Sequence, residues 1–414
     1  MPQPSVRRSP AIVEKVGGRT RQLRRILADG GPREVGARAL QRLVKRLDVP
    51  DDVPPVRTAD VLAADIGAGW TAERLPLGPG EPMQINIVTT PPATGSGGHT
   101  TTFRLISYLE ARGNVCRVYL YDVYGGDARF HEQHIRSMFP ALRAEILDVE
   151  AGLSDAHTTV ATSWPTAYPV FNARVRGDRT YLVQDFEPWF YPRSSSSALS
   201  EATYRMGFHA VTAGRWLSMK LSAEYGMDAD PFEFGCDTER YHLTGAGPRD
   251  GIVFYARPGA PRRAFEIGMM ALELFAAEHP DTRIHLYGKH LGSVPFPAVD
   301  HGLLTPDQLN DVYNRCYAGL SLSMTNVSLV PHEMLAAGCL PVVNDADHNR
   351  IVLDNDHVRY AEPSPRALAD ALAGVVAMAD FDHESKSAAG SVETISWDDA
   401  GAAVEAALRR RLTT

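Results

Sequence analysis

The sequence predicts an α/β fold of two doubly wound domains, each built on a parallel sheet. Apolar segments of strand length alternate with segments of helical periodicity from residue 84 onward, and the alternation starts again at residue 252. The 414 residues are too many for one ordinary hydrophobic core and suit two domains of roughly 150–200 residues each. With 44% hydrophobic and 22% charged residues, the composition is that of soluble globular proteins.

The first 50 residues form a basic arm, with 12 Lys and Arg against 4 Asp and Glu. Because the whole chain carries a net charge of −8, the remainder carries −16. Residues 37–47 alternate leucines and basic residues at helical spacing, which predicts an amphipathic helix that suits an anionic membrane surface. The alternatives are a helix docked on the protein's own body or a disordered tail. No aromatic residue precedes Trp70, so no nucleic-acid partner is expected.

In residues 84–121, the pattern of apolar residues predicts a strand, a glycine-rich loop, a helix at 100–112 and a second strand. Gly97 and Gly98 end the loop and allow a ligand to approach the backbone ahead of a helix N-terminus. The alternative is a loop that merely turns. His99 caps the helix or bonds a loop carbonyl, or else it lies near a reacting centre, as a resemblance described below implies.

Two carboxylates follow the strand predicted at residues 181–184, namely Asp185 and Glu187. Because they lie two residues apart at a strand end, both side chains can point into a crevice at the carboxyl edge of the sheet. The alternative is an Asx turn with a solvated glutamate.

In the second half of the chain, two consecutive predicted strands are each followed by a cationic residue. Arg257 and Lys289 follow the strands predicted at 252–255 and 283–287, so both lie at the carboxyl edge of one sheet. A helix is expected from Arg262 to Glu278. Converging cations suit a diphosphate, and the alternatives are an ion-paired arginine and a solvated lysine.

The pattern is clearest at residues 319–345, where it predicts a strand, a loop, a helix and a second strand. Its helix begins near Ser328, with Pro331 in the first turn and Gly338 just past the end, the usual asymmetry of helix termini. The helix N-terminus lies at the carboxyl edge of the sheet and suits a diphosphate. Glu333, about one turn in, can accept hydrogen bonds from sugar hydroxyls, and the alternative is a packing helix with a solvated glutamate.

The four cysteines, Cys116, Cys236, Cys316 and Cys339, show no C-x-x-C spacing, which favours a reduced cytosolic protein. No run of about 18 apolar residues predicts a membrane span, and the N-terminus lacks the apolar core of a signal peptide. We therefore expect a cytoplasmic protein, with the basic arm as its candidate contact to the inner face of the plasma membrane.

The run PHEMLAAGCLPVVN at 331–344 resembles the donor-site signature of nucleotide-sugar glycosyltransferases of the GT-B fold, in their large retaining family. Glu333 matches the second glutamate of the E-x7-E pattern of that family, whereas Thr325 stands in the place of the first. This departure suits a donor sugar with fewer hydroxyls, such as a 6-deoxyhexose. The resemblance implies two Rossmann-like domains facing across a cleft, and retention of configuration.

Two further runs resemble bacterial rhamnosyltransferases of surface polysaccharide assembly, namely SGGHTTxxR at 96–104 and QDFEPWFYP at 184–192. In that resemblance Gly97 and Gly98 face the donor diphosphate, and Asp185 or Glu187 contacts the acceptor hydroxyl or the transferred sugar. It further implies that Arg257 and Lys289 stabilise the departing diphosphate. The implied donor loop comprises Thr325, Asn326, Ser328 and Leu329.

The expected protein is thus a glycosyltransferase that moves a sugar, L-rhamnose from dTDP-rhamnose by resemblance, onto a saccharide or lipid-linked glycan acceptor. No cofactor is expected, and no metal, because no D-x-D pair stands at a metal-binding position. The alternatives are a nucleotide-sugar epimerase of the same fold and a non-catalytic glycan or nucleotide binder. The expected parts are an arm and linker (1–55), an acceptor domain (56–240), a donor domain (241–395) and a C-terminal helix crossing back to the acceptor domain (396–414).

Overall fold

The computed structural model describes residues 53–92, 96–245 and 247–413. The basic arm and its amphipathic helix at 37–47 lie outside the described residues, and their association with a membrane stays a prediction. The described residues from Pro54 onward form one compact unit.

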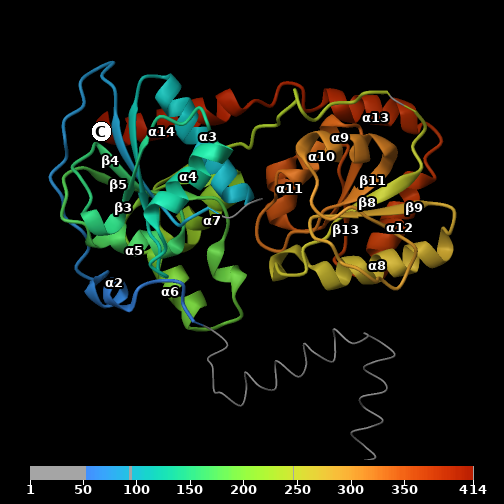
Figure 1. The fold of residues 1–414 in the computed structure, drawn as a ribbon, viewed down its shortest axis with the longest axis horizontal. Coiled ribbons are helices and arrows are strands. Elements are labelled where there is room, and N and C mark those ends of the chain that lie inside the picture. Colours follow the sequence, from blue (N-terminus) through green and yellow to red (C-terminus); the bar gives the residue numbers. More distant parts are fainter. Residues whose placement is uncertain (1–52, 93–95, 246, 414) are drawn as a thin grey trace, which may run out of the picture. The chain divides into compact units, whose positions relative to one another are not determined.

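The first lobe, called the N-lobe and comprising the elements from α2 to β7, is built on a parallel seven-stranded sheet (Figure 1). The strand order is β3-β2-β1-β4-β5-β6-β7, so the direction of winding switches between β1 and β4. The strands are β1 (Gln84–Thr89), β2 (Val115–Leu120), β3 (Glu145–Asp148), β4 (Thr158–Ala161), β5 (Asp178–Val183), β6 (His209–Ala213) and β7 (Ala229–Phe232).

Helices and 3₁₀ turns connect these strands. Helix α3 buries Phe103, Ile106 and Leu109, the stripe that its 3.6-residue periodicity predicts. The connections are α2 (Thr58–Ala63), α3 (Gly97–Ala111), α4 (Ala128–Met138), η1 (Val149–Ala151), α5 (Trp164–Asn172), η2 (Glu187–Phe190), α6 (Ser195–Thr203) and α7 (Arg215–Tyr225).

The second lobe, called the C-lobe and comprising the elements from β8 to α13, repeats this architecture on a parallel six-stranded sheet. Its order, β10-β9-β8-β11-β12-β13, switches direction between β8 and β11. The strands are β8 (Gly251–Tyr255), β9 (Arg283–Tyr287), β10 (Val299–Asp300), β11 (Cys316–Leu320), β12 (Leu340–Asn344) and β13 (Arg359–Ala361).

The start of helix α9 shows how local sequence sets an element boundary. The Thr305 hydroxyl accepts the N–H of Gln308, and the Gln308 side chain accepts the N–H of Thr305, with Pro306 at the first helical position. The connections of the C-lobe are η3 (Pro261–Arg263), α8 (Phe265–Glu278), α9 (Pro306–Arg315), α10 (Val330–Ala336), α11 (Asp347–Leu353), α12 (Pro365–Val376) and α13 (Phe381–Gly390).

The last helix, α14 (Trp397–Thr413), returns to the N-lobe and packs against α3, β6 and β7 (Figure 1). The approach to α3 is close, because a Cβ at Gly401 would stand 2.3 Å from Cγ of Tyr108. Trp397 at its start lies beneath the Arg104 guanidinium, 5.0 Å from the ring centroid. The end of the chain thereby ties the two lobes together.

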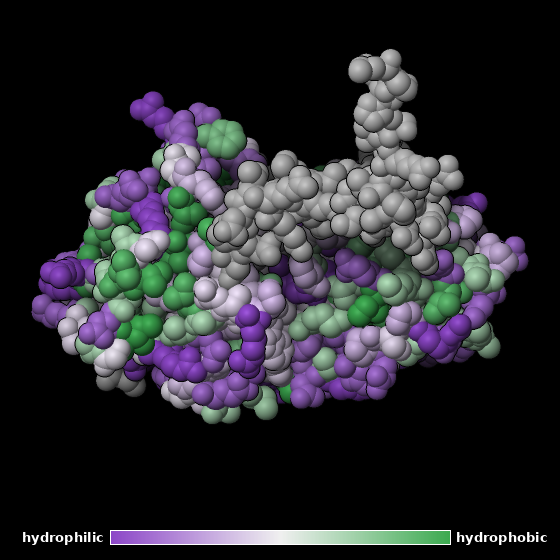
Figure 2. All heavy atoms as spheres, turned by 90° about the horizontal axis from the view of Figure 1, so that it is seen from below, coloured by the Kyte–Doolittle hydropathy of each residue, from purple (hydrophilic) through white to green (hydrophobic). Residues whose placement is uncertain are grey.

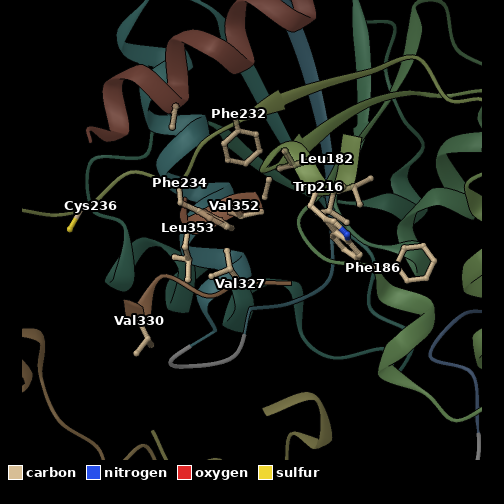
Figure 3. Packing of buried hydrophobic residues seen from close by; sticks show 14 of the residues in the cluster. Leu182, Phe186, Trp216, Phe232, Phe234, Cys236, Val327, Val330, Val352 and Leu353 are labelled. Atoms are coloured by element: carbon tan, nitrogen blue, oxygen red, sulfur yellow. The ribbon is translucent and has the colours of Figure 1, made fainter. Parts of the chain in front are cut away.

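The buried apolar side chains of both lobes form one continuous cluster. Figure 3 shows Val352 and Leu353 of α11 and Val327 of the C-lobe near Phe234 of the segment after β7. Gly214, which has a φ of +85°, brings the start of α7 so close to Val352 that a Cβ there would lie 2.7 Å from the valine. On the face shown in Figure 2, hydrophobic residues are interspersed with hydrophilic ones, as is usual for a surface in contact with water.

The structure corrects several predicted boundaries. The helix expected at 100–112 begins three residues earlier, at Gly97. The helix expected from Arg262 begins at Phe265, because Ala264 adopts a left-handed conformation (φ +46°) that separates η3 from α8. Helices α5 and α6 were not predicted: two prolines interrupt the pattern of α5, and a serine run of low helix propensity opens α6.

Candidate functional site

A cavity of about 250 Å³ opens where the loops of the two lobes meet. Residues just beyond β1 and β4 line it on the N-lobe side, so it lies at the switch point of that sheet, the usual ligand site of doubly wound folds. The lining includes seven residues predicted from the sequence: Gly97, Gly98, His99, Asp185, Glu187, Ser328 and Leu329.

The N-terminus of α3 forms one wall of the cavity. Among the described residues, leaving aside chain neighbours and the helix's own backbone, no atom lies within 4 Å of the place where a Cβ of Gly97 would stand, and a Cβ of Gly98 would meet the amide group of Gln184 at 3.7 Å. The backbone is therefore open to a ligand at the positive end of a 15-residue helix.

His99, in the first turn of α3, has both ring nitrogens engaged. Nδ1 lies 2.8 Å from the Ser96 hydroxyl and Nε2 lies 3.0 Å from the Thr90 carbonyl oxygen. Burial lowers the pKa of this imidazole, and the bond to the Thr90 carbonyl opposes the shift. This geometry matches the alternative in which His99 bonds a loop carbonyl. The ring also lines the cavity, and its place near the reacting centre stays a prediction.

Asp185 and Glu187 both line the cavity but have different partners. The backbone N–H of Trp164 donates to Glu187 Oε2 at 2.9 Å, and the Tyr181 hydroxyl donates to Oε1 at 3.1 Å. Burial raises the pKa of Glu187 to about 8. Burial also raises the pKa of Asp185, against the opposing charges of Arg263 and Arg262. Glu187 is thus an anchor of the loop, and Asp185 is the carboxyl group that faces cationic groups.

Sequence reasoning missed two arginines of η3. Arg262 and Arg263 line the cavity from the C-lobe, and Arg262 Nε stands 3.7 Å from Asp185 Oδ2. Arg263 donates to the Ser323 hydroxyl at 3.0 Å, and burial lowers its pKa. Cations at the positive end of a helix oppose its dipole, and this unfavourable placement just before α8 is the signal that could have marked them.

The donor loop predicted at 325–329 divides between two environments. Ser328 and Leu329 line the cavity, whereas Thr325 and Asn326 are buried. The amide of Asn326 donates across the lobes to the carbonyl oxygens of Gln184 (2.9 Å) and Ala213 (3.2 Å). Asn326 therefore joins the lobes in this structure.

Arg257 and Lys289 lie two residues beyond β8 and β9, whose ends, Tyr255 and Tyr287, are register partners. Both cations thus stand at the same edge of the sheet, as predicted. Arg257 donates to the Tyr255 hydroxyl at 3.0 Å, and Lys289 is exposed. Neither residue is part of the lining of the cavity.

Glu333 lies in the first turn of α10, as predicted, outside the lining of the cavity. Burial raises its pKa to about 7, the positive charge of Arg104 lowers it, the negative charge of Asp237 raises it and a hydrogen bond from Tyr313 lowers it. A carboxyl group whose pKa lies near 7 can bind hydroxyl groups either as a hydrogen-bond donor or as an acceptor.

No group of three or more His, Cys, Asp or Glu side chains is arranged to hold a metal ion within residues 53–92, 96–245 and 247–413. Over the same part of the chain, no helix has the length and apolar character needed to cross a membrane.

Two doubly wound lobes with a cavity between their strand ends define the GT-B fold, and solved structures of that fold are similar to this chain. TarM from S. aureus, in complex with UDP, fondaparinux and α-GlcNAc-glycerol, has a TM-score of 0.63 at 8% identity, over 79% of this chain and 99% of TarM. HepE from Anabaena, in complex with UDP, has a TM-score of 0.61 at 12% identity, over 79% of this chain and all of HepE. The GT-B fold predicted from the sequence is confirmed.

Part of the sequence is similar to a described family and to a protein of O-antigen biosynthesis. Residues 250–373 match the family described as WsaF, C-terminal domain. A 216-residue stretch, half of this chain, is 32% identical to the O-antigen biosynthesis protein RfbC of Myxococcus xanthus and spans 17% of that protein. These similarities confirm the resemblance to GT-B glycosyltransferases of polysaccharide assembly.

Proposed function

We propose that the protein is a glycosyltransferase that moves a sugar from a nucleotide-sugar donor onto a saccharide or lipid-linked glycan during cell-surface polysaccharide synthesis. The observation that carries this proposal is the cavity between the lobes, where the open N-terminus of α3, Asp185 and the Ser328–Leu329 segment meet. The RfbC and WsaF similarities support the same function.

In this proposal the acceptor hydroxyl oxygen bonds to the anomeric carbon of the donor sugar, and the bond from that carbon to the phosphate oxygen breaks. The electron pair leaves with the nucleoside diphosphate, whose departing oxygen takes the hydroxyl proton. Arg257, Lys289 and the start of α10 stabilise the charge that develops on the diphosphate. Asp185 orients the acceptor hydroxyl, and Glu333 binds a hydroxyl of the donor sugar.

The transferred sugar is proposed to be L-rhamnose from dTDP-rhamnose. The support is the resemblance of the runs at 96–104 and 184–192 to rhamnosyltransferases, together with Thr325 in place of an acid. A thermal-shift panel of dTDP- and UDP-sugars tests this donor. Stabilisation by dTDP-rhamnose above that by UDP-hexoses is expected, and the reverse order would refute the rhamnose donor.

Substitution of the two cations tests the enzyme against its rivals. Arg257→Gln and Lys289→Gln are each expected to lower kcat by ~10²-fold or more, as for loss of an oxyanion donor. Arg366→Gln, which removes an exposed arginine paired with Glu278, serves as the matched control and leaves kcat unchanged. Loss of affinity alone would favour a non-catalytic binder, and conversion of the nucleotide sugar without an acceptor would favour an epimerase.

Retention of configuration and independence of metal are part of the proposal. The anomeric configuration of the product, read by NMR coupling constants, is expected to equal that of the donor. Because cations of the chain are assigned to the diphosphate, EDTA is expected to leave the rate within about twofold, and a larger loss restored by Mg²⁺ would contradict the assignment.

A further inference from the structure

Arg262 lies in the cavity with hydrogen-bonding capacity unused. Its guanidinium stacks over Phe190, with Cζ 4.4 Å from the ring centroid, and its Nε stands 3.7 Å from Asp185 Oδ2, too far for a hydrogen bond. The described residues supply no hydrogen bond to this side chain, although a guanidinium carries five N–H donors. Stacking and charge hold Arg262 in place and leave its terminal N–H groups to a ligand.

Phe190 provides a flat apolar surface in the same cavity. It ends η2, the 3₁₀ turn that also contains Glu187, and its side chain is half-buried and lines the cavity. The anchored carboxyl of Glu187 holds this turn in place, because the Trp164 backbone and the Tyr181 hydroxyl bind both of its oxygens. The ring is therefore presented on a rigid support.

The remaining wall on the N-lobe side is rich in hydroxyl groups. Thr90, Thr162 and Ser163 line it at the ends of β1 and β4. Aromatic surface beside hydroxyls, a carboxylate and a guanidinium suits a sugar ring, which has apolar C–H faces and a polar rim.

We propose that Phe190, Arg262 and Asp185 form the subsite for the terminal sugar ring of a saccharide acceptor, an inference that rests on the glycosyltransferase function proposed above. One C–H face of the pyranose packs against the part of the Phe190 ring that the Arg262 guanidinium leaves uncovered, and its hydroxyls bind that guanidinium and the Asp185 carboxylate. The attacking hydroxyl is thereby held at Asp185.

The Phe190 ring suits a sugar rather than a phosphate, because a phosphate has no C–H surface to pack on an aromatic ring. The acceptor is favoured over the donor sugar because Phe190 and Asp185 belong to the N-lobe, whereas the side chains assigned to the nucleotide sugar, Arg257, Lys289 and Ser328, belong to the C-lobe. Of the N-lobe, only the backbone at Gly97 and Gly98 is assigned to the donor, at its diphosphate.

Steady-state kinetics on the full chain test this assignment. The acceptor probes are p-nitrophenyl α- and β-glycosides of rhamnose, glucose, mannose and N-acetylglucosamine, and the readout is release of nucleoside diphosphate. Phe190→Ala is expected to raise the acceptor KM by about tenfold and to leave the donor KM within about twofold, whereas Phe190→Tyr retains the wild-type acceptor KM. Arg262→Lys, which keeps the charge but loses the flat stacking surface, raises the acceptor KM as well.

Phe130→Ala is the matched control, because Phe130 is 62% exposed on α4 and lies outside the cavity lining. It is expected to change neither KM. A rise in the donor KM of Phe190→Ala would place the ring on the donor sugar instead, and unchanged KM values would remove the subsite. Either result overturns the proposal.

Saturation-transfer NMR with the methyl glycosides of the same sugars gives a readout independent of turnover. At least one glycoside is expected to receive saturation from the aromatic protons of the wild-type chain and of Phe130→Ala, but not of Phe190→Ala. This result would support a saccharide subsite even if glycosyl transfer itself failed. Equal signals in all three proteins, or none with any glycoside, would refute it.

Discussion

At the scale of single residues, two carboxyl groups of one short loop differ in what surrounds them. Glu187 is enclosed by a backbone N–H and a tyrosine hydroxyl, whereas Asp185 faces the guanidinium groups of Arg262 and Arg263. The spacing of two residues predicted both groups at the strand end, but only the packing shows that Glu187 anchors the loop and that Asp185 faces the two guanidinium groups.

The raised pKa of Glu187 makes the stability of the protein depend on pH. With a pKa of about 8 in the folded state against an ordinary value of 4.5, the folded protein holds a proton that the unfolded chain releases between pH 4.5 and 8. Stability contributed by this proton is complete below pH 4.5 and is lost as the pH rises through 8.

Glu187→Gln, which is neutral and of similar shape, removes this dependence. From pH 5 to pH 8 the wild type is expected to lose roughly 2–4 kcal/mol of unfolding free energy relative to the variant. Urea unfolding at the two pH values measures the difference. Parallel losses in wild type and variant would show that Glu187 is ionised in the folded state.

At the scale of elements, periodicity and strand-end rules predicted most of the fold. The units at 84–121 and 319–345 appear as β1-α3-β2 and β11-α10-β12, and Arg257 and Lys289 stand beyond neighbouring strands as expected. The predicted start of α8 at Arg262 was wrong, because a hydrophobic pattern does not reveal that Ala264 adopts a left-handed conformation.

The contacts that the site makes between the two lobes could not be predicted from the sequence. Because the helix was predicted to begin at Arg262, this arginine was interpreted as a helical residue and was not considered for the site. The roles of Asn326 and Phe190 depend on contacts between segments far apart in sequence, such as Asn326 with Ala213, which neither spacing nor propensity encodes.

The start of α3 gives a prediction in which stability and binding change differently. Alanine at Gly97 or Gly98 meets no steric obstacle among the residues that the structure describes, and alanine has the higher helix propensity, by up to about 1 kcal/mol. The melting temperature of either variant should be unchanged or raised. Affinity for the nucleotide-sugar donor, measured by calorimetry, should fall by about tenfold, since the methyl group takes the space of the phosphate. Unchanged affinity would mean that the diphosphate does not touch this turn.

Two mid-helix glycines test the packing of α14. A Cβ at Gly401 would lie 2.3 Å from Tyr108 of α3, whereas a Cβ at Gly374 in α12 would meet nothing within 4 Å. Gly401→Ala is expected to destabilise the protein by roughly 1–3 kcal/mol through overpacking. Gly374→Ala should stabilise it by up to about 1 kcal/mol. Chemical denaturation compares the two, and equal effects would mean that α14 does not rest on α3.

At the scale of the whole molecule, the donor loop is also a connection between the lobes. Asn326 donates to two carbonyl groups at the ends of β5 and β6, and its neighbours Ser328 and Leu329 line the cavity. A ligand bound at this loop therefore acts on the same segment that holds the lobes together. Closure of two domains around a ligand on such a segment is a known mode of conformational change.

Asn326→Ala removes the two hydrogen bonds that the Asn326 amide makes across the lobes, to Gln184 and Ala213. The expected cost is roughly 1–3 kcal/mol of unfolding free energy, with a larger radius of gyration in small-angle scattering and weaker donor binding. Asn349→Ala is the matched control, because the buried Asn349 amide donates at 2.8 Å to Asn344 within the C-lobe. It should cost similar stability and leave the scattering unchanged. If both variants kept the wild-type radius while losing stability, Asn326 would be an ordinary buried amide, and coupling of the lobes would have to come from the apolar contacts of α11 with α7 and the return of α14.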